Sequence, residues 1–170
     1  MLYPDETGMM FSDRMHLCAN PIEKLETIRG ASWEFSDVKM KPADKTPGEF
    51  LKIPEVNTWD IELELANDCE LIINVCGEDI AFDAKSREVR LSAAKLSFPA
   101  DAKELKLRII VDQASIEIFG CDGRIWYAKR KLTTPAHPVI FPYQTSGTGS
   151  LKKIKIHRVN SIWNCGSSLK

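Results

Sequence analysis

Two carboxylates stand close together in the apolar segment IIVDQASIEIFGCDGRIW, residues 109–126: Asp112 and Glu117. Hydrolysis of a glycosidic bond uses such a pair. One carboxyl group is protonated as the acid, and the other is ionised as nucleophile or base, roughly 5 to 9.5 Å away across a cleft. These residue types therefore raise glycosidic-bond hydrolysis as a first hypothesis.

The surrounding pattern favours a structural role for both carboxylates. Residues 105–112 and 115–120 each alternate apolar and polar, which predicts two strands joined by a tight turn at residues 113–114. Alternation places Glu117 on the opposite face from Ile116 and Ile118, so we expect Glu117 at the surface. We expect Asp112 to form the turn, with its carboxylate accepting backbone N–H groups just ahead of it.

Length and charge narrow the class of protein. A chain of 170 residues with 44% apolar residues suits one domain with a single core. The 23 basic and 24 acidic residues give a net charge of -1, so we expect neither nucleic acid nor an anionic membrane as a partner. No stretch has the roughly 18 apolar residues of a membrane span, and the N-terminus does not resemble a signal peptide.

The five cysteines are odd in number and irregularly spaced. This fits neither a disulfide framework nor a CxxC zinc pair, so we expect reduced thiols. They favour a reducing compartment such as the cytoplasm without fixing the location. The histidines, His16, His137 and His157, lack metal-site spacing, and Ser115 lacks a GxSxG elbow, so we expect no metal, no cofactor and no serine nucleophile.

Period-two alternation dominates the chain and predicts an all-β fold. WDIELEL, residues 59–65, reads as a half-exposed strand with Trp59 in the core. About ten strands at short intervals predict an antiparallel two-sheet β-sandwich, jelly-roll-like or concanavalin-like. Asp122-Gly123 between two apolar runs predicts a hairpin turn. The further predicted strands span residues 71–75, 78–83, 87–91, 124–130 and 150–159.

One segment, NPIEKLETIR at residues 20–29, has helical spacing. We expect Pro21 in its first turn, Gly30 as its C-terminal cap, and the whole as a short N-terminal lead-in to the sheets. Residues 40–49 and the proline-rich residues 134–149 read as surface loops.

Aromatic residues offer a possible sugar-binding surface. Trp126 and Tyr127 alternate in one predicted strand, so one of the two faces outward and could stack on a sugar ring. Trp33 and Trp163 lie near the ends of the domain, where packing is as reasonable as ligand contact.

The segment LRIIVDQASIEIFGCDGRIWY resembles a motif of the C-terminal β-sandwich domain of glycoside hydrolase family 32, the invertases, inulinases, levanases and fructanases. Residues 20–30, 78–91 and 156–163 resemble other segments of that domain, in the same order. The resemblance spans residues 14–163. The positions that match the motif are Leu107, Arg108, Ile109, Val111, Asp112, Ser115, Glu117, Phe119, Asp122 and Gly123.

The resemblance implies an accessory role rather than catalysis. The family's catalytic residues lie on a separate five-bladed propeller, in motifs of the form W-x-N-D-P-N-G, R-D-P and E-C, and none of the three occurs in this sequence. We therefore expect no catalytic residue here. We also expect a lead-in or linker at residues 1–30, a sandwich at 31–163 and a tail at 164–170.

Three hypotheses follow. In the first, the chain is the non-catalytic module of a fructan- or sucrose-cleaving hydrolase, and its partner is the catalytic propeller. In the second, it is an independent carbohydrate-binding module that recognises fructans or other oligosaccharides. In the third, Asp112 and Glu117 form a small active site. A homo-oligomer is compatible with each of them.

Overall fold

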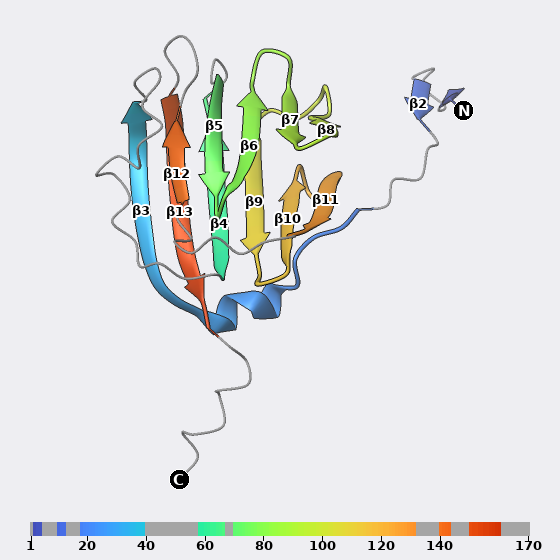
Figure 1. Ribbon diagram of the computed structural model, residues 1–170. Coiled ribbons are helices and arrows are strands. Elements are labelled where there is room, and N and C mark those ends of the chain that lie inside the picture. Colours follow the sequence, from blue (N-terminus) through green and yellow to red (C-terminus); the bar gives the residue numbers. More distant parts are fainter. Residues whose placement is uncertain are drawn as a thin grey trace.

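Two antiparallel sheets face each other in the computed structural model of the chain (Figure 1). The structure describes residues 2–4, 10–12, 18–39, 58–66, 70–131, 140–143 and 150–160. The six-stranded sheet has the order β11 (Ile125–Arg130), β10 (Ser115–Gly120), β9 (Leu105–Val111), β4 (Trp59–Leu65), β13 (Ser150–Val159) and β3 (Arg29–Lys39). The five-stranded sheet has the order β12 (Ile140–Tyr143), β5 (Glu70–Val75), β6 (Glu78–Asp83), β7 (Glu88–Leu91) and β8 (Ala94–Ser97).

The chain builds four strands of the second sheet between two neighbouring strands of the first, and the fifth, β12, follows later, between β11 and β13. After β4 it crosses over to form β5 to β8, and it then returns as β9, which pairs with β4 in register from Trp59↔Val111 to Leu65↔Leu105. Strand β13 closes the six-stranded sheet between β4 and β3. A separate hairpin of β1 (Leu2–Pro4) and β2 (Met10–Ser12) precedes this body.

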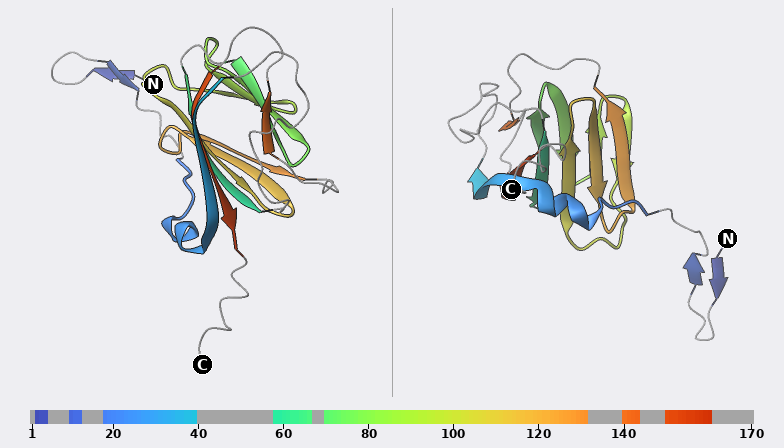
Figure 2. Two further views of the ribbon diagram at one scale, coloured as in Figure 1. Left: turned by 90° about the vertical axis from the view of Figure 1, so that its left-hand side faces the viewer. Right: turned by 90° about the horizontal axis from the view of Figure 1, so that it is seen from below.

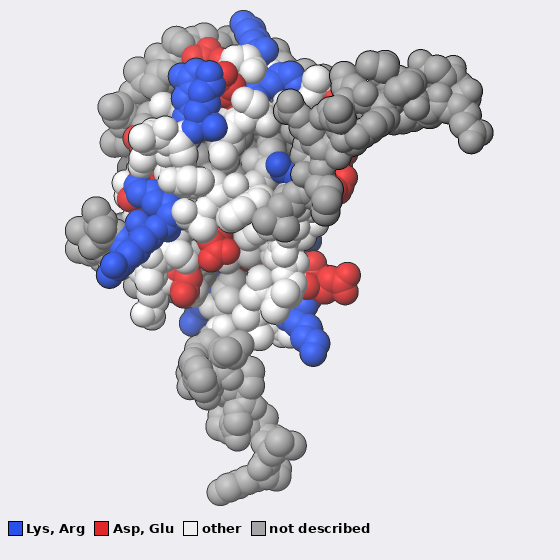
Figure 3. All heavy atoms as spheres, turned by 90° about the vertical axis from the view of Figure 1, so that its right-hand side faces the viewer, with Lys and Arg blue, Asp and Glu red and all other residues white. Residues whose placement is uncertain are grey.

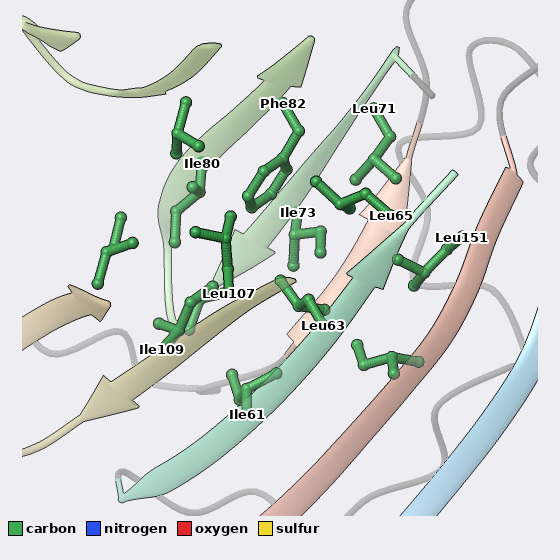
Figure 4. Close-up of a cluster of buried hydrophobic side chains, with 14 of the residues drawn as sticks. Ile61, Leu63, Leu65, Leu71, Ile73, Ile80, Phe82, Leu107, Ile109 and Leu151 are labelled. Carbon is green, nitrogen blue, oxygen red and sulfur yellow. The ribbon is translucent and has the colours of Figure 1, made fainter. Parts of the chain in front are cut away.

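The core lies between the two sheets, where alternate residues of β4, β5, β9 and β10 point inward and are buried. Ile61 and Ile109 of one sheet and Ile73 and Phe82 of the other are essentially inaccessible to solvent, and their side chains face one another (Figure 4). Trp59 is also fully buried and meets Trp33 edge to face, with ring centroids 6.0 Å apart. The predicted β-sandwich and the core position of Trp59 are confirmed.

The predicted helix is much shorter than its sequence pattern. Residues Glu23–Ile28 form one 3-10 helix, η1, and Arg29 already begins strand β3. Pro21 therefore precedes the helix, and Gly30 is a strand residue rather than a cap. Both expectations were wrong. Gly30 is a strand residue because pairing of β3 with β13 competes with extension of the helix beyond Ile28. The left view of Figure 2 shows η1 on the side of the six-stranded sheet that faces away from the five-stranded sheet.

Strand β12 corrects the interpretation of residues 134–149 as a loop throughout, because Ile140–Tyr143 pairs with β5 despite Pro142. It is an edge strand, the position in which a sheet tolerates proline. Strands β3 and β8 were not predicted either. Residues 40–49 lie outside the described residues.

Candidate functional site

Asp112 lies at the turn of the β9–β10 hairpin, as predicted, but its carboxylate does not hold the turn. The turn is closed by the backbone N–H of Asp112, which donates to the Ser115 carbonyl at 3.0 Å. The Asp112 carbonyl accepts a hydrogen bond from Nζ of the buried Lys131 at 2.8 Å. The carboxylate is exposed and makes no hydrogen bond with any residue that the structure describes, which corrects the expected capping role.

Glu117 lies on the outward face of β10, between the fully buried Ile116 and Ile118. Its Oε1 accepts a weak hydrogen bond from Ser115 Oγ at 3.4 Å. Neither Asp112 nor Glu117 lines the groove on the outer face of the six-stranded sheet or the smaller hollow beside β5, β6 and β7. The two carboxylates therefore do not face each other across a cleft, which is the geometry that glycoside hydrolysis requires.

Arg108, the motif's arginine, binds a buried carboxylate that the sequence pattern assigned to the surface. Arg108 Nε and Nη2 donate to Asp60 Oδ1 and Oδ2 at 2.8 and 2.7 Å. Arg29 Nε also donates to Asp60 Oδ2 at 2.7 Å, and Arg29 Nη2 pairs with Glu62. Asp60 is only 1% exposed although it points away from the core, because the two arginines cover it.

The electrostatics of this ion cluster (Arg29, Asp60, Glu62 and Arg108) hold Asp60 ionised. Burial raises the pKa of Asp60. The hydrogen bonds from Arg108 and Arg29 and the charges of these arginines lower it by more than burial raises it, so the pKa lies below its usual range. Burial lowers the pKa of Arg29, but its hydrogen bonds with Asp60 and Glu62 and the charges of these two carboxylates together outweigh burial, so the Arg29 pKa is raised. The cluster ties β3, β4 and β9 together on the outer face of the sheet.

His157 is a buried group beside this cluster. It lies opposite Asp60 in the register of β13 and β4, and its Nε2 lies 3.8 Å from Glu62 Oε1. Within the described part of the chain, Nε2 has no hydrogen-bond partner. Burial and the positive charge of Arg29 lower the pKa of His157, and the charge of Glu62 offsets this only in part. The imidazole is therefore held neutral more strongly than a free histidine.

Phe119 and Trp126 form a cross-strand pair on the outer face of β10 and β11. Trp126 is 45% exposed, whereas its neighbour Tyr127 packs against the core. Of the two predicted candidates for an outward aromatic ring, the structure selects Trp126. Among the described large apolar residues, only Ile22 and Trp126 are exposed.

The Asp122-Gly123 turn connects β10 to β11 as predicted, and it also anchors the lead-in. Cys121, Asp122 and Gly123 all have positive φ, at 51°, 56° and 82°. The Ala19 N–H donates to the Gly123 carbonyl at 3.0 Å. A Cβ on Gly123 would lie 2.8 Å from Ala19 N, so only glycine allows both this backbone conformation and this contact.

A groove of about 910 Å³ lies on the outer face of the six-stranded sheet. Its walls are Asn20 and Pro21 of the lead-in, the loop at residues 101–104 and the turn after β10. Its floor includes the outward side chains of Glu62, Arg108, Phe119 and Lys155, which come from four neighbouring strands. Charged residues of both signs are also interspersed over the side of the molecule that carries the β8 and β11 edges (Figure 3).

The remaining expectations concern metal sites, membrane-spanning segments and thiols. Within the described residues, no group of three or more His, Cys, Asp or Glu side chains is arranged to hold a metal ion, and no helix is long and apolar enough to span a membrane. Free thiols are found at Cys18, Cys76 and Cys121, and burial raises the pKa of the Cys76 and Cys121 thiols. Among the histidines, cysteines and tryptophans of the sequence, His16, Cys69, His137, Trp163 and Cys165 lie outside the described part.

Comparison with known proteins gives a consistent assignment. Residues 24–158 match the family model described as "Glycosyl hydrolases family 32 C terminal". A levanase from Bacillus subtilis (strain 168) is 24% identical over 177 residues, which cover 90% of this chain and 26% of the levanase. The chain thus spans about a quarter of the length of that relative.

Solved structures share the fold. Exo-inulinase from Aspergillus awamori superposes with a TM-score of 0.66 at 15% identity, covering 94% of this chain and 34% of that chain. Sucrose-6-phosphate hydrolase from Lactobacillus gasseri superposes with a TM-score of 0.61 at 16% identity, covering 94% and 33%.

Proposed function

Because the chain belongs to the C-terminal domain family of the family 32 glycosyl hydrolases, we propose that it is the accessory module of a fructan- or sucrose-cleaving enzyme. In this proposal it packs against a catalytic propeller and stabilises it. The proposal keeps the expected division into a lead-in at residues 1–30, a sandwich at 31–163 and a tail at 164–170, except that Arg29 and Gly30, as the first residues of β3, belong to the sandwich. The relatives named levanase and exo-inulinase support fructans as the substrates of the whole enzyme.

The observation that carries the proposal is the attachment of the lead-in to the sandwich. Ala19 bonds to Gly123, the Asn160 N–H donates to the Ile28 carbonyl at 2.9 Å, and η1 ends where Arg29 enters the ion cluster. A domain joined before residue 18 would therefore be held next to the lead-in, where Ile22 is an exposed apolar side chain. Ile22 is followed by Glu23 and Lys24, and such mixed polarity is usual for interfaces between domains of one chain.

The proposal also assigns no catalysis to the chain alone. The three motifs that carry catalysis in the family do not occur in the sequence, and Asp112 and Glu117 lie outside the groove. We expect no release of reducing sugar from sucrose, inulin or levan by the isolated chain. Release by a pure sample that is lost in Asp112→Asn would refute this part of the proposal.

Association with a propeller is tested directly by mixing. The chain and a family 32 catalytic propeller from the same organism are combined and analysed by size-exclusion chromatography with light scattering. We expect a one-to-one complex that Ile22→Glu weakens, because Ile22 is 67% exposed on the lead-in. Lys85→Ser, at an exposed turn of the other sheet, is the control and should leave the complex unchanged. Two components that elute separately at all concentrations would contradict the proposal.

A further inference from the structure

The outward side chains of the six-stranded sheet form one continuous row across five strands. Each pair of neighbours in the row is in register, from Trp126↔Phe119 through Phe119↔Arg108 and Arg108↔Glu62 to Glu62↔Lys155. With strands about 4.8 Å apart, the row is about 19 Å long, which is longer than a single sugar ring. Four of its five members line the groove, and Trp126 extends the row beyond the groove at the β11 edge.

From this row we infer that the groove binds a fructan-type oligosaccharide, with one terminal sugar on Trp126 and Phe119 and the following sugars over Arg108, Glu62 and Lys155. The identification of the sugar as a fructan rests on the proposed function. The geometry of the site does not.

The aromatic end of the row suits the apolar face of a sugar ring. Trp126 is 45% exposed, and Phe119 is half-buried beside it, without being part of the core. A ring that is held by its strand and open to solvent on one face loses little conformational entropy when a flat ligand stacks on it. Tyr127, one position away, faces the core and cannot take this part.

The polar part of the row suits hydroxyl groups rather than a charged ligand. Basic and acidic side chains line the groove in nearly equal numbers, so it attracts neither a polyanion nor a polycation. Several charges are already paired, such as Arg124 with Asp101 at 2.9 Å, and paired groups keep donor and acceptor positions for neutral hydroxyls. Lys155 lines the groove, and its ammonium group has three N–H donors that can serve the ligand.

The size of the groove agrees with an oligosaccharide. About 910 Å³ lies near the upper end of small-molecule sites, which are typically about 300 to 1,000 Å³. The lead-in residues Asn20 and Pro21 form one wall. The site therefore lies beside the segment that would connect to the propeller, and a polymeric substrate could contact both domains.

The test is calorimetric titration of the 170-residue chain with levan-type and inulin-type oligosaccharides. We expect binding that weakens at least ten-fold in Trp126→Ala and in Phe119→Ala, equivalent to about 1.4 kcal/mol. Tyr127→Phe is the matched control, since it alters the inward aromatic residue of the same strand, and it should bind as the unmodified chain does. Thermal unfolding of each variant checks that the fold is intact.

Two results would overturn the inference. One is the absence of binding to either fructan type, and the other is binding that both alanine variants retain. The same variants are tested for association with the propeller. If Trp126→Ala abolishes that association and no sugar binds, Trp126 is an anchor of the domain interface and the inference is wrong. Sugar binding by a chain that never associates with the propeller would support the inference while refuting the proposed function.

Discussion

The two faces of the six-stranded sheet are built from the same strands but are held together differently. On the inner face, Ile61, Ile109 and Ile118 pack side by side with no access to solvent. On the outer face of β4 and β9, Asp60 and Arg108 meet through two hydrogen bonds. Apolar burial has no preferred direction, whereas the ion cluster requires particular atoms at particular distances. The inner face therefore supplies most of the stability, and the outer face supplies specific geometry.

If the inner face supplies most of the stability, the largest loss of stability should come from placing a charge there. Ile116→Asp should unfold the domain, because an unpaired buried carboxylate costs several kcal/mol against a total stability of about 5 to 15 kcal/mol. Arg130→Asp places the same group at an exposed position and should remain folded. Urea unfolding followed by tryptophan fluorescence distinguishes the two. A cooperative transition in Ile116→Asp would mean that the faces are assigned the wrong way round.

The next effect comes from breaking the ion cluster on the outer face. Asp60→Asn should lower the free energy of unfolding by about 3 kcal/mol, because it leaves two partly buried guanidinium groups without their carboxylate. Glu62→Gln should cost under about 1 kcal/mol, since the Glu62 side chain is 41% exposed. Equal losses in the two variants would contradict the special place given to Asp60.

Gly123 tests whether the lead-in depends on the hairpin turn. Gly123→Ala should cost about 1 to 2 kcal/mol through its positive φ and should also displace Ala19. Gly77→Ala is the control, because Gly77 has a similar φ of 88° in a turn of the other sheet. Hydrogen exchange at the Ala19 amide should accelerate only in the first variant. Equal exchange rates in both would show that the Gly123 contact does not hold the lead-in.

Protonation of His157, on the outer face, should make the free energy of unfolding depend on pH. Because its folded pKa lies below the unfolded value of about 6.5, its stabilising contribution is complete above that pH and is lost as the pH falls through the folded pKa. The free energy of unfolding should therefore decrease below pH 6.5, by at most about 1.4 kcal/mol per pH unit. His157→Gln should show a shallower slope in denaturant titrations over this range. An unchanged slope would remove His157 from the account.

The smallest effect is expected at the pair of carboxylates that first suggested catalysis. The Glu117 side chain points outward and takes part in only one weak hydrogen bond, so Glu117→Gln should change the free energy of unfolding by less than about 0.5 kcal/mol. Oligosaccharide binding and reducing-sugar assays should be unchanged. Loss of an activity in a folded Glu117→Gln variant would revive the catalytic hypothesis.

The sequence predicts the inner face well because alternation is a local signal. The segment at residues 59–65 shows its buried side through Trp59 and Ile61, and the strand found there has the predicted bounds. Local sequence patterns do not predict a strand that forms only because a distant strand pairs with it. Residues 29–39 form β3 because β13, more than 100 residues later, pairs with them. The proline in β12 conceals a strand that only the edge of a sheet can accept.

The outer face could be predicted only in part. Outward positions for Glu117 and for either Trp126 or Tyr127 follow from alternation. The burial of Asp60 does not, since Arg29 lies 31 residues before it and Arg108 lies 48 residues after it. The groove has the same origin, because its floor combines β4, the β9–β10 hairpin and β13, which are distant from one another in the sequence. The motif at residues 107–123 does indicate this face, because its Arg108 is the residue that binds Asp60.

The accessory role is tested most directly by the thermal half-life of a family 32 catalytic propeller from the same organism, measured by sucrose hydrolysis with and without this chain. We predict that the chain alone hydrolyses nothing and that adding it in excess lengthens the half-life of the propeller. We also predict that the Ile22→Glu variant protects the propeller less well. A half-life that is the same with and without the chain, or hydrolysis by the chain alone, would contradict the assignment as an accessory module.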